Sequence, residues 1–491
     1  MQKRTLNLIF GLKVRLLRQQ AGLTLSQLSE RTGTGVGYLH DIEKGKKLPS
    51  ADKTLVLAEA LGTTYDYLVS PQASKKLQPI VDLLESDFFR SYPLEMFGLE
   101  PAKIIELLSD EPEKVTTFVS VILSIARNYH LTQENLYLVA LRAYQDMHDN
   151  YFEDLEQSAQ AFRIQHGLDA RLPVRTSDLE RVLADHFGVR VDRTRMASIP
   201  ALRVLRSCFS DTTRTLYLNA GLSSAQENFL LARELAFQHL KPAVRPYETI
   251  LLHPDSFMVL LSNFRASYFA SALLMDALRL AADVRLCAAG TRWAPEDWLA
   301  LLGRYDATAE MLMQRLTNIL PRQLGVKDLF FIRMQGDEAL DDYVMTKELH
   351  LSGHQSPHSS ERGEHYCRRW ISINILRQLG STGASDVVAG AQLSRYWQSP
   401  NTYLCISMAK MDGAGRRNGV SVTLGLLLND TLRRHFRFVD DPLMPVKTVH
   451  TTCETCSIAD CEARAAAPVE VEKEAERLAV LAGIRMLNEG V

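Results

Sequence analysis

The stretch from Leu23 to Pro49 constrains the fold more than any other part of this 491-residue chain. It predicts two short helices joined by a tight turn. Thr24 stands where a helix begins, with a hydroxyl that can accept a hydrogen bond from a free backbone N–H group. Gly33 stands where the chain must leave that helix in a left-handed conformation. The second helix has one apolar face and ends at a glycine, as shown by Tyr38, Leu39, Ile42 and Gly45.

Flanking segments supply further apolar faces, at Leu16, Leu17, Leu55, Leu57, Ala58, Leu61 and Leu68. Over residues 5–70 the whole pattern resembles the phage-repressor-like (Xre/Cro) helix-turn-helix. The matching positions are Leu23, Thr24, Leu28, Gly33, Tyr38, Leu39, Ile42, Glu43, Gly45, Pro49, Leu57, Ala58, Ala60, Leu61 and Gly62. The resemblance implies a DNA-binding module. An unrelated small helical bundle is the alternative that the residues leave open.

The charge of this first segment differs from that of the whole chain. Its seventy residues hold ten lysines and arginines against six acidic residues, whereas the full chain has a net charge of −2. A local positive field suits a module that contacts phosphates. Lys44, Lys46 and Lys47 follow the second helix and are placed for such contacts, which position a protein without reading sequence.

Base reading is expected from the start of the second helix, where few side chains can form bidentate hydrogen bonds. We therefore expect thymine methyl contacts, close backbone approach at the glycines and DNA shape to contribute. The residues predicted to contact double-stranded DNA are Thr24, Gln27, Thr34, Gly35, Val36, Gly37, Tyr38, His40, Asp41, Lys44, Lys46 and Lys47.

The rest of the chain predicts a multidomain protein, mainly α with an α+β C-terminal part. We expect the helix-turn-helix domain at 1–70, a helical linker at 71–160, an α+β domain at 161–285 and a mixed-sheet domain at 286–491. Helices are expected over Val115–Tyr129 and Leu136–Met147. They are a candidate dimerisation region, since such modules commonly pair to read two half-sites; a simple spacer is the equal alternative.

Cysteine content and hydropathy bear on the compartment. Seven cysteines are an odd number, and no secretory signal precedes the first helix, so we expect a reducing, cytoplasmic environment. The longest apolar run, near residues 118–126, is too short to span a bilayer, and no membrane partner is expected.

Residues 161–285 carry an altered catalytic pattern. Strands are predicted at Gly188–Val191 and Thr215–Asn219, followed by helices at Ala225–His239 and Arg265–Met275. The order resembles the ImmA/IrrE metallopeptidase fold, in which the first helix bears His-Glu-x-x-His as two zinc ligands and a general base. This chain has Arg233, Glu234 and Phe237 at those positions.

The zinc ligands are therefore missing from this helix. His239 comes two residues late, about 200° around the helix from the second ligand position. The third ligand is expected near Asn263 or Arg265, and neither supplies a carboxylate. We expect a scaffold without catalytic residues, in which Glu234 is an ion-pair or surface residue, and no enzyme activity. A metallopeptidase that cleaves a partner repressor is the disfavoured alternative.

The C-terminal segment predicts a mixed sheet with helix on one side. An amphipathic helix is expected at Thr308–Leu320 and a strand at Asp328–Arg333. Thr402–Met408 and Gly419–Leu427 alternate or run apolar, which is typical of neighbouring antiparallel strands.

Three cysteines near the C-terminus, Cys453, Cys456 and Cys461, form a C-x2-C-x4-C cluster in a polar stretch. In a reducing compartment this spacing indicates metal binding, as a closed zinc site or an iron–sulfur cluster. Cys367 is the best candidate for the fourth ligand, ahead of His450. Metal-free surface thiols are the alternative. The other cysteines, Cys208, Cys287 and Cys405, are expected to pack as small hydrophobic residues.

The full domain order resembles the short-chain fatty acyl transcriptional regulators (ScfR). The residues that carry the resemblance are Arg315, Leu316, Thr317, Phe330, Phe331, Arg333, Cys367, Trp370, Cys453, Cys456, Cys461 and Arg464. It implies a DNA-binding regulator of carbon or short-chain fatty acid metabolism that senses an acyl-CoA-like metabolite. It also favours an iron–sulfur cluster, [4Fe–4S] before zinc, at Cys367, Cys453, Cys456 and Cys461. A homodimer or higher homo-oligomer bound to a DNA operator is expected.

Overall fold

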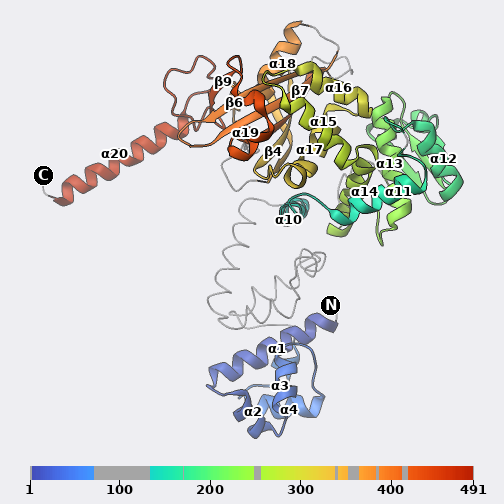
Figure 1. Ribbon diagram of the computed structural model, residues 1–491. Helices are drawn as coiled ribbons and strands as arrows, with labels where there is room; N and C mark the ends of the chain where they lie inside the picture. Colours follow the sequence, from blue (N-terminus) through green and yellow to red (C-terminus); the bar gives the residue numbers. More distant parts are fainter. Residues whose placement is uncertain are drawn as a thin grey trace. The chain divides into compact units, whose positions relative to one another are not determined.

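The computed structural model describes most of the chain, in two compact units (Figure 1). The described ranges are 3–70, 133–169, 171–247, 256–337, 341–351, 364–382, 386–411 and 418–489. Residues 1–144 with 251–262 form one unit, and residues 145–250 with 263–491 form the other. The helix predicted at residues 115–129, in the candidate dimerisation region, lies outside the described residues.

Five helices form the N-terminal domain: α1 (Lys3–Gln20), α2 (Leu25–Thr32), α3 (Val36–Glu43), α4 (Ala51–Ala60) and α5 (Tyr65–Val69). Thr24 caps α2 as predicted, because its hydroxyl accepts from the Gln27 N–H group. Gly33 ends that helix with φ of 63°, in the left-handed region that favours glycine. The predicted pair of helices and its turn are confirmed.

The core of this domain is a cluster of buried apolar side chains from all five helices and the turns between them, namely Phe10, Val14, Leu23, Leu28, Leu39, Ile42, Leu57, Ala58, Leu61 and Leu68. Leu55 is a correction: it is 55% exposed, because it lies on the outer face of α4. Gly11 allows α1 to cross α3 closely, since a Cβ there would lie 2.3 Å from the Ile42 carbonyl oxygen. That contact fixes the angle between the two helices.

The central helices run from α10 to α17. They are α10 (Gln133–Met147), α11 (Glu153–Gln165), α12 (Thr176–Phe187), α13 (Ser224–Leu240), α14 (Phe257–Leu274), α15 (Ala277–Ala289), α16 (Pro295–Tyr305) and α17 (Ala309–Gln323). Short 3-10 turns lie at η2 (Met196–Ser198) and η3 (Pro200–Val204). α14 alone among the described helices is long and apolar enough to cross a membrane. It is 61% buried inside the protein, as core helices are.

A small three-stranded sheet precedes α13. β3 (Thr215–Leu218) lies in the centre, parallel to β1 (Arg190–Asp192) and antiparallel to β2 (Ser207–Ser210). The strands predicted at 188–191 and 215–219 correspond to β1 and β3, and β2 is additional. Ser223 and Gln226 form a capping box that starts α13 directly after this sheet.

A six-stranded mixed sheet dominates the C-terminal region, with the order β5-β4-β8-β7-β6-β9. Its strands are β4 (Leu329–Asp337), β5 (Asp342–His350), β6 (Val388–Tyr396), β7 (Thr402–Met411), β8 (Asn418–Leu427) and β9 (Val446–Val449). All neighbours are antiparallel except β6 and β9. The predicted antiparallel pairing of the two long apolar strands is confirmed, with Ile406 of β7 opposite Leu424 of β8.

Both faces of this sheet are covered, rather than the one face expected. The helix α18 (Ile371–Thr382) packs on one face against Phe330, Ile332 and Tyr403. Side chains that alternate with these, such as Phe331, are buried as well, and α17 contacts β4 and β8. The chain then forms α19 (Asp430–His435), the turn η5 (Arg437–Asp440) and, after the cysteine-rich segment, α20 (Val469–Glu489).

Candidate nucleic-acid interface and metal centre

The first turn of α3 presents a small and open surface. Val36 and His40 are exposed, and so are Gly35, which precedes the helix, and Gly37. A Cβ at either glycine would have no neighbour within 4 Å. There is therefore open space for a ligand to approach the backbone of this turn closely.

Three of the residues predicted to contact DNA have structural tasks. Thr24 and Gln27 cap α2 reciprocally, since the Thr24 N–H group donates to Gln27 Oε1 at 2.8 Å. Thr34 is a correction: its side chain is 7% exposed and its hydroxyl donates to the Thr32 carbonyl at 3.4 Å. The Thr34 hydroxyl forms its hydrogen bond within the turn between α2 and α3, so this side chain does not face solvent.

A basic turn follows α3 and folds back on it. Lys47 forms an ion pair with Asp41 at 2.9 Å, and this pairing lowers the pKa of Asp41 and raises that of Lys47. Tyr38 lies beneath two ammonium groups, 5.4 Å from Lys47 and 4.5 Å from Lys53. Lys46 is exposed on the same turn. Lys53 was not predicted here, because only tertiary packing brings α4 beside α3.

Two largely buried basic residues of α1 bind the ends of other helices in this domain. Arg18 of α1 holds Glu43 at the end of α3 through two hydrogen bonds of 2.6 and 2.9 Å. The Lys13 ammonium donates to the carbonyls of Tyr67 and Ser70, each at 2.6 Å. Burial lowers the pKa of Lys13 to about 8. These contacts fix α3 and α5 against α1.

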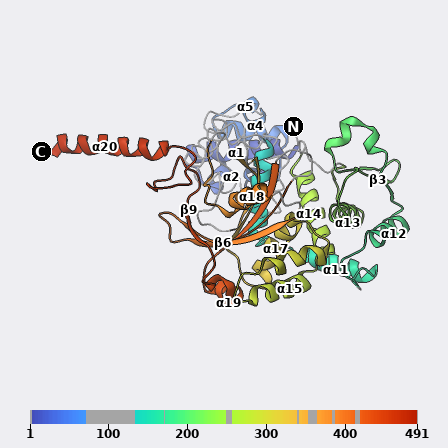
Figure 2. The ribbon, with the colours of Figure 1, turned by 90° about the horizontal axis from the view of Figure 1, so that it is seen from above.

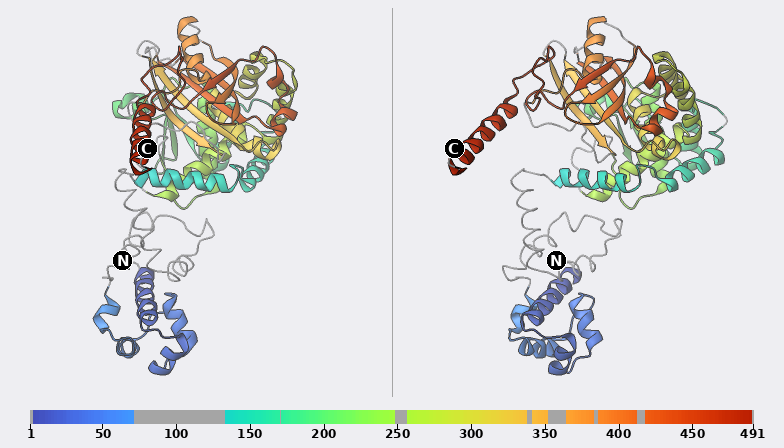
Figure 3. Two further views of the ribbon diagram at one scale, coloured as in Figure 1. Left: turned by 90° about the vertical axis from the view of Figure 1, so that its left-hand side faces the viewer. Right: turned by 60° about the vertical axis from the view of Figure 1, so that its left-hand side comes forward.

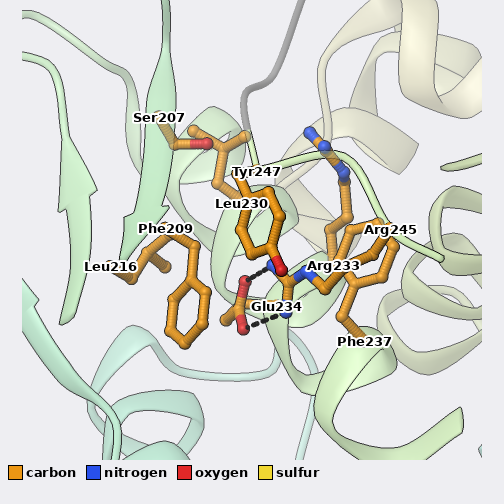
Figure 4. Close-up of a pocket in the computed structure, with 9 residues that line it drawn as sticks. All are labelled: Ser207, Phe209, Leu216, Leu230, Arg233, Glu234, Phe237, Arg245 and Tyr247. Atoms are coloured by element: carbon orange, nitrogen blue, oxygen red, sulfur yellow. Dashed lines mark hydrogen bonds and ion pairs between the residues drawn. The ribbon is translucent and has the colours of Figure 1, made fainter. Parts of the chain in front are cut away.

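In the second unit, a buried ion pair links α13 to the loop that follows it (Figure 4). Glu234 is 3% exposed and accepts two hydrogen bonds from Arg245, at 3.0 and 2.8 Å. Gln238 donates to the same carboxylate at 2.6 Å. Of the two roles that the sequence left open for Glu234, ion pair and surface residue, the structure has the ion pair.

Aromatic rings enclose the Arg245 guanidinium. Its central carbon lies 4.6 Å from the ring centre of Phe209, 4.3 Å from Phe237 and 5.4 Å from Tyr247. These residues line a small pocket together with Arg233 (Figure 4). His239 lies elsewhere, 3.0 Å from the Ser158 hydroxyl and against Phe162. The sequence did not identify Arg245 as the partner of Glu234. Arg245 lies in a loop, where no hydrophobic periodicity indicates which side chains are buried.

A second buried ion pair joins α11, α14 and α17. Arg315 is fully buried and donates to both carboxylate oxygens of Glu156, at 2.6 and 2.8 Å, and to the Met275 carbonyl at 3.0 Å. Tyr268 donates to Glu156 at 2.7 Å. From the sequence, Arg315 was singled out only by a family resemblance. Its buried position and its contacts with Glu156 and Met275 indicate a structural role.

The cysteine-rich segment pairs with a strand-like stretch far earlier in the chain. Tyr366 and Thr452 form an antiparallel bridge. The Cys367 N–H group donates to Thr451 at 3.0 Å, and the Cys453 N–H group donates to the His365 carbonyl at 2.8 Å. This pairing places Cys367 and Cys453 on the two stretches of one antiparallel bridge. Burial raises the pKa of Cys367 most, and the thiols of Cys453 and Cys456 raise it further.

Arg464 binds several carbonyl groups of the loop that contains Cys461. Its guanidinium donates to the carbonyls of Cys453 at 3.2 Å and Cys456 at 3.3 Å, and to Ile458. Its own N–H group donates to the Cys461 carbonyl at 3.1 Å. Cys461 is half-buried on this turn, whereas Cys453 and Cys456 are buried. Across the described residues, no three His, Cys, Asp or Glu side chains are already arranged to hold a metal ion.

The donor set nevertheless fits a thiolate-bound metal. Cys367 Sγ accepts from the His450 N–H group at 3.5 Å, and Cys453 Sγ accepts from the Ala465 N–H group at 3.4 Å. Backbone N–H groups aimed at sulfur stabilise the negative charge of a thiolate ligand. The alternative ligand, His450, has its Nδ1 atom 3.3 Å from two threonine hydroxyls. Cys405 lies in the core of β7, where burial raises its pKa to about 12.

Comparisons with known proteins agree on one class. The helix-turn-helix domain family matches residues 9–68. The chain is 21% identical over 493 residues to the HTH-type transcriptional regulator RamB of Mycobacterium tuberculosis (strain ATCC 25618 / H37Rv), which covers 93% of this chain and 94% of RamB. It is 21% identical over 350 residues to the propionyl-CoA carboxylase regulator of Cereibacter sphaeroides, covering 67% and 68%.

Two further similarities concern parts of the chain. An HTH-type transcriptional regulator of Sinorhizobium fredii is 36% identical over 55 residues, 11% of this chain and 71% of that protein. A solved Mycobacterium tuberculosis transcriptional regulator has a TM-score of 0.48 at 18% identity, covering 66% of this chain and 92% of that chain. The chain thus has an Xre-type helix-turn-helix domain and is homologous to transcriptional regulators.

Proposed function

We propose that this protein is an operator-specific transcriptional regulator of carbon or short-chain fatty acid metabolism. It acts in the cytoplasm as a homodimer and responds to an acyl-CoA-like metabolite, to redox state, or to both. The main supporting observation is the exposed surface of α3, at Val36 and, one turn further, at His40, together with the basic turn that follows the helix. The chain is also homologous to regulators along 93% of its length. The name of the Cereibacter sphaeroides relative supports the metabolic assignment.

DNA binding is tested with the full-length protein and the DNA that flanks its own gene. Fluorescence anisotropy between 50 and 300 mM salt should show specific binding whose log K falls linearly with log salt. Lys46→Gln should weaken binding to all sequences about equally and reduce the salt slope by about one. Lys473→Gln, an exposed lysine of α20, is the matched control. The proposal fails if the protein shows no preference for this DNA over unrelated DNA at any salt concentration.

The C-terminal part is proposed to hold an iron–sulfur cluster, [4Fe–4S] before zinc. Cys367, Cys453, Cys456 and Cys461 would hold it, and the group would supply a redox-sensitive anchor for the loop. The residues themselves keep that loop in place: Arg464 binds its carbonyls, and the Glu454 carboxylate accepts from the His365 N–H group at 3.0 Å.

Metal analysis after anaerobic purification tests this assignment. Iron and acid-labile sulfide with a broad visible absorption are expected in the wild type. Cys453→Ser should abolish them, while Cys287→Ser, at a half-buried cysteine on α15, should retain them. One zinc per chain without iron would replace the cluster by a structural zinc site, and a metal-free wild type would refute both.

A further inference from the structure

One side of the helix α3 is available to a ligand. α3 packs against α1 and α2 within the bundle of blue helices (Figure 2 and Figure 3). Its inner positions, Leu39, Ile42 and Glu43, are buried. Val36 and His40 are exposed. Because residues four apart share a face of a helix, these two side chains belong to one outward surface.

The polar side chains predicted to contact bases around this surface have partners inside the domain. The Gln27 side chain accepts from the Thr24 N–H group at 2.8 Å, and Thr34 is buried in the turn before α3. Asp41 lies 2.9 Å from Lys47, in an ion pair with the basic turn. Positions 33–41 contain no asparagine, glutamine, arginine or lysine, so the bidentate pairs that these residues form with adenine or guanine are not available there.

Val36 is the apolar side chain of this surface. It is 42% exposed and occupies the first position of α3. Its neighbours Gly35 and Gly37 have no Cβ atom, and the space that a Cβ would occupy is open. A duplex can therefore come close to the Val36 isopropyl group without meeting a neighbouring side chain. In the major groove, thymine differs from the other bases by a methyl group, which apolar side chains contact.

We propose that Val36 determines the DNA specificity of this protein by contacting the methyl group of a thymine in the major groove. The inference rests on the proposed function, because it names the base feature that the DNA-binding surface reads. The sequence left thymine methyl groups, backbone approach and DNA shape as joint sources of readout. Exposure of Val36 between two open glycines, with the polar candidates engaged elsewhere, favours the first source.

The expected effect is that of one buried methyl group. The free energy of burying one CH₂ group corresponds to about a fourfold change in affinity for each contacted thymine. Deoxyuridine lacks this methyl group and keeps the hydrogen-bonding edges of thymine. Replacing thymine by deoxyuridine therefore removes the proposed contact, and comparing two proteins on both kinds of DNA isolates the part of the effect that depends on Val36.

The experiment uses the full-length protein and the shortest fragment of the DNA flanking its own gene that it protects in a footprint. The fragment is made once with thymine and once with deoxyuridine throughout. Fluorescence anisotropy should give wild type an affinity at least about fourfold lower for the deoxyuridine version. Val36→Ala should bind thymine DNA more weakly and differ by less than about twofold between the two versions. Val69→Ala is the matched control and should behave as wild type, since Val69 of α5 is 41% exposed and receives the same change.

Three outcomes would overturn the inference. Equal affinities of wild type for the two versions refute the methyl contact and leave the proposed function standing. A loss on deoxyuridine DNA that is as large in Val36→Ala as in wild type assigns the effect to DNA shape and refutes the role of Val36. A wild type without preference for its flanking DNA refutes the proposed function and this inference together. Far-ultraviolet circular dichroism shows that each variant is folded.

Discussion

At the scale of single residues, a buried ion pair determines the surroundings of Glu234. Glu234 occupies the position of a general base in the metallopeptidase pattern, yet both of its oxygens accept from Arg245. Phe237, which stands where that pattern has a histidine, packs against the same guanidinium. A carboxylate engaged in this way, beside an aromatic ring, holds the loop at Arg245 against α13.

Removing that carboxylate charge should destabilise the protein. Glu234→Gln leaves the Arg245 guanidinium buried without its partner, and we expect the free energy of unfolding to fall by about 3 kcal/mol. Urea denaturation followed by circular dichroism measures it. Glu472→Gln, at an exposed glutamate of α20, should change the midpoint little. Equal midpoints for Glu234→Gln and the wild type would show that the pair is not structural.

A second residue-scale prediction concerns the crossing of α1 and α3. Gly11→Ala would place a methyl group 2.3 Å from the Ile42 carbonyl oxygen, so the helices must separate, at a cost of about 1–3 kcal/mol. Gly37→Ala is the control, since no atom lies within 4 Å of the added methyl. Thermal unfolding should show a lower midpoint for Gly11→Ala only. A stabilised Gly11→Ala variant would contradict the close approach.

At the scale of elements, three helices meet around histidines. His166 at the end of α11 is 8% exposed, and its ring centre lies 4.4 Å from that of His186 in α12. Among the described residues, its Nδ1 atom has no hydrogen-bond partner. Burial lowers the pKa of His166, and the neighbouring His186, His239 and Arg181 lower it further. The packing of these helices therefore favours a neutral imidazole.

This arrangement predicts a loss of stability on acidification. In the unfolded chain His166 binds a proton near pH 6.5, whereas the folded protein resists protonation, so stability is full above pH 6.5 and declines as the pH falls below it. Urea midpoints at pH 7.5 and 5.5 measure the decline. His166→Phe should reduce it, and His40→Gln, at an exposed position of α3, should not. A decline of the same size in His166→Phe would rule out this residue as its source.

Prediction of elements from the sequence succeeded where periodicity was clear. The capped amphipathic helices α2 and α17 and the apolar strands β7 and β8 have their expected places. The strand β2 has four residues and becomes recognisable only by pairing with β3. α20 has no single buried face, so the pattern of its apolar residues gave no signal for a packed helix.

At the scale of the whole molecule, the cysteine loop and the DNA-binding domain belong to different compact units. A bound group can change DNA affinity only if the two states of the protein differ in free energy of binding. Cys453→Ser should therefore alter the affinity for operator DNA, measured by anisotropy, by about fivefold or more. Cys287→Ser serves again as control. Equal affinities of Cys453→Ser and the wild type would leave the cysteines a purely structural role.

The sequence by itself determined the local features: the cap at Thr24, the left-handed turn at Gly33, the basic turn after α3 and the identity of the three clustered cysteines. These depend on neighbours within a few residues, so short-range patterns reveal them. Tertiary structure alone decided that Thr34 points inward, that Arg245 pairs with Glu234 and that the stretches containing Cys367 and Cys453 pair with each other. Those outcomes depend on contacts between distant segments, which fix burial and charge pairing, and no local pattern encodes them.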